Sequence, residues 1–165
     1  MKIGDAICFE NEGTLFGNLI EKFTGSRITH VGMVYYGNTF IEASLQGIRI
    51  VPIDKIKNRA YWLCELKAEH RKKFYRNDSL LKAFIAKQVT KPYDFAQIAK
   101  FIPFYLTGGL YTPKEDNSLY VCSELVFAIY ELMKVLTNVN SSIKTPNDVL
   151  LLNIFRFKTY QRKVI

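Results

Sequence analysis

The stretch Val121-Cys122-Ser123-Glu124-Leu125-Val126 begins the most strongly patterned helix that this sequence predicts. From Cys122 onward, apolar residues recur at helical spacing and form one stripe: Leu125, Val126, Ile129, Leu132, Met133 and Leu136. A cysteine in the first turn meets unpaired backbone N–H groups and the positive end of the helix dipole, which favour a thiolate. The pattern therefore predicts a helix over 122–136 with either a nucleophile or a small gap-filling core residue at its start.

Three short apolar runs over 29–36, 39–43 and 47–53 precede this helix and predict an antiparallel β-meander. The first two are joined by Gly37-Asn38, which is typical of a tight hairpin turn. Alternation along paired strands brings His30 and Glu42 to one face, within side-chain reach or one strand step apart. A histidine beside a carboxylate is a sensible general base and orienting residue. A strand histidine with an unrelated rim glutamate is the alternative.

The flanking segments predict further helices and strands. Leu15 begins a short helix with Thr14 as its cap, and 60–67 reads as a fourth strand. The highly charged run 69–78 is interpreted as a solvated face, and a helix follows it. At the C-terminal end we expect a capping box with Thr145 as cap and Asp148 at the third helical position, then a closing strand over 155–164.

Length and composition predict a single domain over residues 1–165. The chain has 48% hydrophobic and 23% charged residues, which is enough apolar material for a core and argues against disorder. The net charge of +8 suits an anionic partner such as nucleic acid, anionic lipid or an acidic polymer, but it also suits a solvated basic face. We expect no nucleic-acid partner, and the composition leaves the oligomeric state open.

The three cysteines are scattered, and none has the spacing of a metal site. This count favours a reducing compartment over a disulfide scaffold, and we expect neither a metal nor another cofactor. The chain begins without a signal-like segment and has no uninterrupted apolar run of about 18 residues. The sequence therefore predicts a cytoplasmic protein without a membrane span.

Seven short motifs follow one another along nearly the whole chain. They are Gly4-Asp5-Ala6-Ile7, Phe23-Thr24-Gly25-Ser26 with 29–34, Phe40-Ile41-Glu42-Ala43, Gly47-Ile48-Arg49-Ile50-Val51-Pro52, Pro92-Tyr93-Asp94-Phe95, Cys122-Ser123-Glu124-Leu125-Val126 and Thr145-Pro146-Asn147-Asp148. In this order they resemble the circularly permuted NlpC-type papain-like cysteine hydrolases, in particular the YiiX/YaeF-like amidases. The resemblance implies an α+β papain-like fold, with an antiparallel β-sheet packed against the nucleophile-bearing helix.

The resemblance also implies a role for each matching residue. Cys122 would be the nucleophile, His30 the base and Glu42 the residue that orients His30. Tyr93 matches a family tyrosine that precedes the nucleophile helix, and it would donate to the oxyanion beside the backbone N–H of Cys122.

The sequence departs from the family pattern in an apolar insert over 95–118. One interpretation is that the insert completes the core. The other is that Phe104 and Tyr105 line the substrate pocket, since pockets are mostly apolar with few polar anchors.

The reaction that the resemblance implies is amide hydrolysis through an acyl-enzyme, by a cysteine peptidase or amidase acting on a cell-wall-type peptide or isopeptide. A lipid acyl hydrolase or acyltransferase of the lecithin retinol acyltransferase type is the second possibility. The third is a non-catalytic module that binds an anionic partner. A thiol-directed probe would separate the enzymes from the module.

Overall fold

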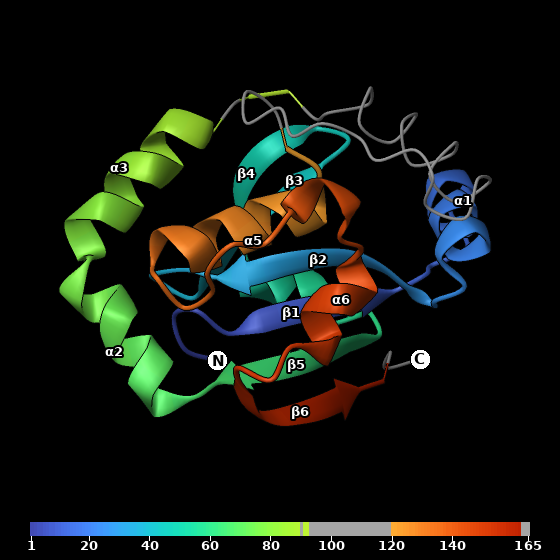
Figure 1. Ribbon diagram of the computed structural model, residues 1–165. Coiled ribbons are helices and arrows are strands. Elements are labelled where there is room, and N and C mark those ends of the chain that lie inside the picture. Colours follow the sequence, from blue (N-terminus) through green and yellow to red (C-terminus); the bar gives the residue numbers. More distant parts are fainter. Residues whose placement is uncertain (90, 93–119, 163–165) are drawn as a thin grey trace.

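A six-stranded antiparallel sheet with strand order β4-β3-β2-β1-β5-β6 organises the protein (Figure 1). The computed structural model describes residues 1–89, 91–92 and 120–162. The strands are β1 (Ala6–Glu10), β2 (Ile28–Val34), β3 (Thr39–Ser44), β4 (Gly47–Pro52), β5 (Tyr61–Leu66) and β6 (Phe155–Gln161). The predicted α+β class and antiparallel meander are therefore confirmed.

Helices cover the sheet and its margins. Helix α5 (Cys122–Leu132) packs across β2 and β3, and α6 (Pro146–Leu151) packs across β1 and β2 (Figure 1). The other described helical segments are α1 (Leu15–Thr24), α2 (Ala68–Arg76), α3 (Asp78–Gln88) and the 3-10 turns η1 (Ile53–Ile56) and η2 (Ser141–Ile143). No helix in the described ranges is long and apolar enough to cross a membrane.

The predicted helix over 122–136 is wrong at its end, because α5 stops at Leu132. Lys134 has a left-handed φ of 55°, which a continuing helix does not allow. Met133, however, is fully buried, and Leu136 packs against the same core. The apolar spacing therefore correctly indicated that these side chains are buried. It did not indicate that the backbone leaves the helical conformation after Leu132.

The charged run 69–78 is a solvated face, as predicted, since only Phe74 within it is buried. Most of it forms α2, whose buried side chain is Phe74. The caps predicted at Thr14 and Thr145 are confirmed: the Thr14 hydroxyl accepts a hydrogen bond from the backbone N–H of Gly17, and Thr145 and Asp148 form the reciprocal capping box. These caps fix where α1 and α6 begin. At α3, where the sequence predicts Asn77 or Asp78 as the cap, the N-cap residue Asn77 makes no side-chain cap hydrogen bond.

The two sheet faces have separate apolar clusters. The face under α5 contains Val31 and Met33 of β2, packed with Leu125 and Ile129 of the helix. The opposite face contains a smaller cluster of Ile7, Phe9, Val34, Phe40 and Ile56. Because side chains alternate along β2, the positions of His30 and Gly32 belong to the second face.

Gly32 is required at its position by close packing between β2 and β3. A Cβ atom there would lie 2.8 Å from Cδ2 of Phe40 and 2.9 Å from the carbonyl oxygen of Ile41. We expect Gly32→Ala to lower the free energy of unfolding by about 1–3 kcal/mol, as overpacking does, measured by urea denaturation.

Gly13→Ala is the control, because a Cβ at Gly13 meets nothing within 4 Å although φ is +77°. Its expected cost is about 1 kcal/mol, from backbone strain alone. A Gly32→Ala loss no larger than this would show that β2 and β3 separate easily.

Candidate active site

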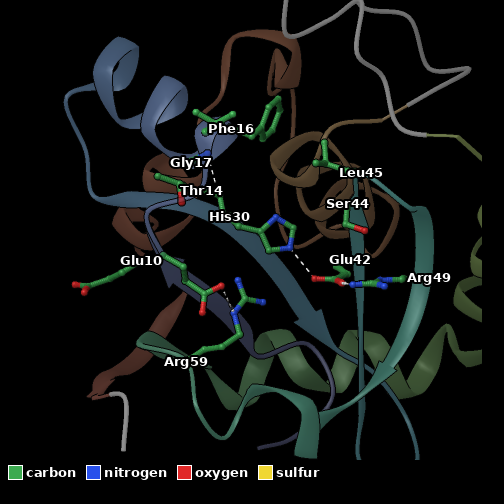
Figure 2. A pocket seen from close by; sticks show the side chains of 13 residues that line it. Glu10, Thr14, Phe16, Gly17, His30, Glu42, Ser44, Leu45, Arg49 and Arg59 are labelled. Atoms are coloured by element: carbon green, nitrogen blue, oxygen red, sulfur yellow. Dashed lines mark hydrogen bonds and ion pairs between the residues drawn. The ribbon is translucent and has the colours of Figure 1, made fainter. Parts of the chain in front are cut away.

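The register between β2 and β3 brings His30 and Glu42 together. Gly32 is the partner of Glu42, so His30 lies diagonally, two residues along β2. Nε2 of His30 is 2.7 Å from Oε2 of Glu42 (Figure 2). The prediction that His30 and Glu42 lie on one face, one strand step apart, is therefore confirmed. The predicted two-residue turn is wrong, because β2 ends at Val34, which pairs with Phe40.

Arg49 holds the other oxygen of the Glu42 carboxylate. It is the direct partner of Glu42 on β4, with Nε at 2.8 Å and Nη2 at 2.7 Å from Oε1. The Glu42 side chain is only 3% exposed, so the two contacts compensate for the burial of its charge. The sequence analysis missed this role. Glu42 and Arg49 are opposite charges placed symmetrically about the turn at Leu45 and Gln46, and that symmetry could have revealed the pair.

The ionisation of His30 and Glu42 is strongly coupled. Burial is the largest single effect on His30 and lowers its pKa, but hydrogen bonds to Cys122 and Glu42, with their charges, together raise the pKa from 6.5 to about 9. Burial acts to raise the pKa of Glu42, but His30 and then Arg49 outweigh it and lower the pKa to about 2. The pair is therefore an imidazolium and a carboxylate at neutral pH.

Cys122 is the first residue of α5, and its side chain interacts with His30. Glu42 already occupies Nε2 of the imidazole, which leaves Nδ1 for the thiol. The thiol belongs to a buried residue that is 3% exposed, whereas Cys8 and Cys64 are fully buried. The structure thus brings the three sequence-predicted residues Cys122, His30 and Glu42 into one cluster.

The remaining sequence-predicted site residues lie outside the described part of the chain. These are Tyr93, for the oxyanion, and Phe104 and Tyr105, for the pocket. Their predicted roles stay predictions.

A cavity of about 540 Å³ opens beside the imidazole. One wall is the N-terminal turn of α1 (Figure 2). Two arginines that the sequence analysis did not single out also line the cavity: Arg49 from β4 and Arg59 from the link between η1 and β5. The lining residues are Glu10, Glu12, Thr14, Leu15, Phe16, Gly17, Thr29, His30, Glu42, Ser44, Leu45, Arg49 and Arg59. The cavity therefore combines charged groups near His30 with apolar side chains farther out.

Phe9 forms the floor under the imidazole. Its ring stacks on His30 with centroids 5.5 Å apart, and the guanidinium carbon of Arg59 lies 3.9 Å from its ring centroid. These contacts fix the ring plane of His30 and the position of Arg59.

The described residues around His30 do not form a set of metal ligands. Within the described ranges, no three His, Cys, Asp or Glu side chains gather in a way that could hold a metal ion. Glu42 is moreover saturated by His30 and Arg49, and two cationic partners disfavour a metal cation there.

The coupled pair makes a prediction about stability and pH. The raised pKa of His30 contributes stability that is complete below pH 6.5 and is lost as the pH rises through about 9. The lowered pKa of Glu42 contributes stability that is complete above pH 4.5 and is lost as the pH falls through about 2. We therefore expect the free energy of unfolding from urea titrations to fall by at most about 3 kcal/mol as the pH rises from below 6.5 to above 9. Glu42→Gln should flatten this alkaline loss, and an equally steep loss in the variant would contradict the coupling.

No protein-family model and no curated protein sequence matches this chain. Among solved structures, it is similar to the crystal structure of metalloprotein yiiX from Escherichia coli O157:H7, DUF1105. The two chains are 18% identical, the TM-score is 0.64, and the alignment covers 99% of this chain and 97% of that one. At this level of identity the likeness concerns the fold, and we conclude that the chain folds as YiiX does.

Proposed function

We propose that this chain is a thiol hydrolase of the permuted papain-like, NlpC type, formed by one domain over 1–165. Cys122 is its nucleophile, His30 its general base and Glu42 the residue that orients the base. The observation that carries the proposal is the 2.7 Å contact between His30 Nε2 and Glu42 Oε2, beside a cysteine at a helix start. Covalent catalysis of acyl transfer requires a nucleophile that contacts a base, and a third group that orients the base.

The proposed reaction starts with His30 as the imidazolium that it is at neutral pH and with the Cys122 sulfur deprotonated beside it. The sulfur then attacks the substrate carbonyl carbon, forming the S–C bond, and the carbonyl oxygen becomes an oxyanion. His30 returns the proton to the leaving amine as the C–N bond breaks. Water next attacks the acyl-enzyme, losing a proton to His30, and releases the acid and the thiol.

The start of α5 supplies the first oxyanion donor. The backbone N–H of Cys122 has no acceptor within its own helix, because it belongs to the first turn. The Val121 N–H donates to Glu124 Oε2 at 3.1 Å, and the Ser123 hydroxyl donates to the Lys144 carbonyl at 2.7 Å. These bonds anchor the residues on both sides of the nucleophile. Tyr93 is the proposed second donor.

We propose an amide in a cell-wall-type peptide or isopeptide as the substrate. The second candidate is a lipid ester, as for an acyl hydrolase or acyltransferase of the lecithin retinol acyltransferase type. It is favoured by the apolar rim of the cavity, where Leu15 is 91% and Leu45 54% exposed. Exposed apolar side chains beside a site can receive an acyl chain.

Alkylation by iodoacetamide tests the nucleophile. Near neutral pH we expect Cys122 to react at least tenfold faster than Cys8 or Cys64, because a thiolate beside an imidazolium is the reactive form. Mass spectrometry of the digested protein measures each cysteine separately. Equal labelling of all three, or protection of Cys122 alone, would refute the catalytic role.

A substrate panel then separates the two enzyme classes. Peptidoglycan-derived peptides and short-chain phospholipid esters are offered to the wild-type chain, with Cys122→Ala as the blank. Release of amine from the peptides alone supports the amidase, and release of fatty acid alone supports the lipid enzyme. If neither product is released and Cys122 is unreactive, the chain would be the non-catalytic module that binds an anionic partner.

A further inference from the structure

We propose that the cavity beside His30 binds an anionic group of the substrate, a carboxylate or a phosphate, through the guanidinium of Arg59. The inference rests on the proposed function, because it names the chemical class of substrate for the same site. It assigns to Arg59 a role in specificity, separate from the roles of Cys122, His30 and Glu42.

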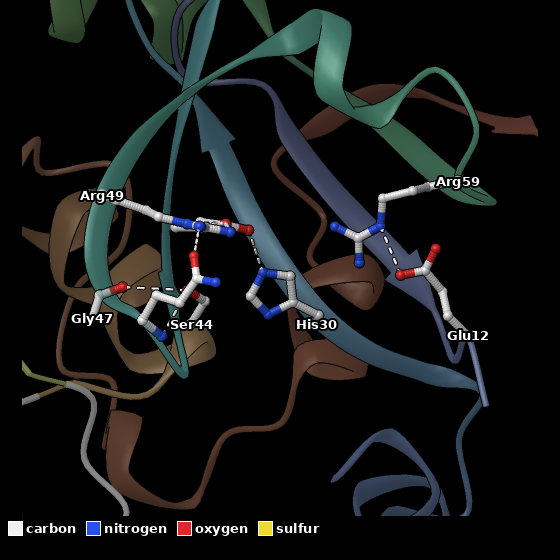
Figure 3. Close-up of polar contacts among 8 residues, drawn as sticks. Glu12, His30, Ser44, Gly47, Arg49 and Arg59 are labelled. Carbon is white, nitrogen blue, oxygen red and sulfur yellow. Dashed lines mark hydrogen bonds and ion pairs between the residues drawn. The ribbon is translucent and has the colours of Figure 1, made fainter. Parts of the chain in front are cut away.

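Arg59 reaches the cavity from the side opposite to Arg49. In Figure 3 its guanidinium end is turned toward His30, while Arg49 lies on the other side of His30. The stacking on Phe9, with 3.9 Å between the guanidinium carbon and the ring centroid, holds the plane of the guanidinium. A planar donor fixed in this way loses little entropy when it pairs with a carboxylate or phosphate.

The terminal nitrogens of Arg59 are available for such a pair. Glu12 is the only carboxylate recorded within ion-pair distance of Arg59 among the described residues, and it contacts Nε at 3.0 Å. A guanidinium presents five N–H donors, so this contact leaves the two terminal nitrogens for a ligand. The Glu12 side chain is 41% exposed, against 25% for Arg59. An entering anion can therefore replace a solvated carboxylate at low cost.

The other carboxylates of the cavity already have partners of their own. Glu42 is held by His30 and Arg49. Glu10 accepts a hydrogen bond from the Tyr160 hydroxyl at 2.9 Å and lies 3.9 Å from Nη2 of Arg27. The charge of each carboxylate is therefore offset by its partners, which reduces its repulsion of an anion in the cavity. The net charge of +8 also attracts anions to the protein.

Paired alkylating reagents measure this preference without a known substrate. Iodoacetate carries a carboxylate and iodoacetamide is its neutral analogue, so the ratio of their rates at Cys122 reports attraction of an anion. We expect Arg59→Gln to lower the iodoacetate-to-iodoacetamide ratio about three- to tenfold at constant ionic strength. Glu12→Gln should raise it, because it removes the competing carboxylate.

Arg76→Gln is the control with matched charge, since Arg76 is exposed on α2 and the cavity does not include it. Its ratio should equal that of the wild type. Arg59→Lys keeps the charge and should retain most of the ratio, which covers the case that Arg59→Gln fails to fold. An unchanged ratio in both Arg59→Gln and Glu12→Gln, or a fall with Glu12→Gln, would overturn the anion site. An iodoacetamide-inert Cys122 would instead reject the proposed function.

Protection experiments identify the source of the anion. Acetate, inorganic phosphate and dihexanoyl phosphatidylglycerol are each tested for slowing the iodoacetamide reaction of Cys122. Protection by acetate points to a peptide carboxylate, by phosphate to a phosphate ester, and by the phospholipid alone to a lipid headgroup. In each case the protection should weaken at least threefold in Arg59→Gln. Protection that is equal in wild type and variant would contradict the assignment.

Discussion

Replacing His30 by alanine is expected to lower turnover about 10²–10⁴-fold, the usual contribution of a general base. The alkylation of Cys122 at pH 7 should also slow, by about tenfold, because a cationic neighbour favours the reactive form of a cysteine. At that pH the wild-type imidazole is an imidazolium, because its pKa is about 9, and alanine would remove this positive charge from beside the sulfur.

The other histidine of the chain provides the matched control. His70 lies on α2 and does not line the cavity, so His70→Ala should leave both rates unchanged. Glu42→Gln keeps a hydrogen-bonding side chain but removes the charge, and we expect a smaller loss than in His30→Ala. If His30→Ala and His70→Ala reacted at the same rate, His30 would be a structural histidine.

The second large effect concerns stability and lies away from the site. We expect Asp5→Ala to lower the free energy of unfolding by about 3–5 kcal/mol, as the breaking of a buried ion pair does. The carboxylate of Asp5 is 1% exposed. Its Oδ1 accepts from Arg71 Nη2 at 2.8 Å and from the Leu66 N–H at 3.0 Å, and its Oδ2 accepts from the Lys2 N–H at 2.6 Å. Alanine would leave Arg71, only 12% exposed, without its counter-ion.

An exposed pair of the same kind is the control. Asp54 lies 2.8 Å from Lys57 but is 66% exposed, and Asp54→Ala should cost less than about 1 kcal/mol. Urea denaturation of both variants at one pH measures the difference. If Asp5→Ala and Asp54→Ala lowered the free energy of unfolding by similar small amounts, the contacts of Asp5 would not contribute to stability. The folded Asp5→Ala protein should still show reactive Cys122, because Asp5 does not line the cavity.

The sequence by itself determined the local parts of this protein. Alternation and the turn residues Gly37-Asn38 predicted that β2 pairs with β3, but they did not give the register. Strand β2 ends at Val34, which pairs with Phe40, so the link is longer than a two-residue turn, and this register places Glu42 on the face of His30. The caps at Thr14 and Thr145 were also readable, because a cap is a contact between residues three apart. The start of α5 at Cys122 followed from its apolar stripe, but its end did not, since burial continues after the helix stops.

Only the tertiary structure decided which distant residues meet. Cys122 interacts with His30 although the two residues lie far apart in sequence, and no spacing along the chain encodes the packing that brings them together. Arg59 enters the cavity through its stacking on Phe9 of β1, a partner far away in sequence. The burial of Glu42 also depends on tertiary packing alone. Because a carboxylate removed from water needs charged or hydrogen-bonding partners, this burial makes the contacts of Glu42 with His30 and Arg49 necessary.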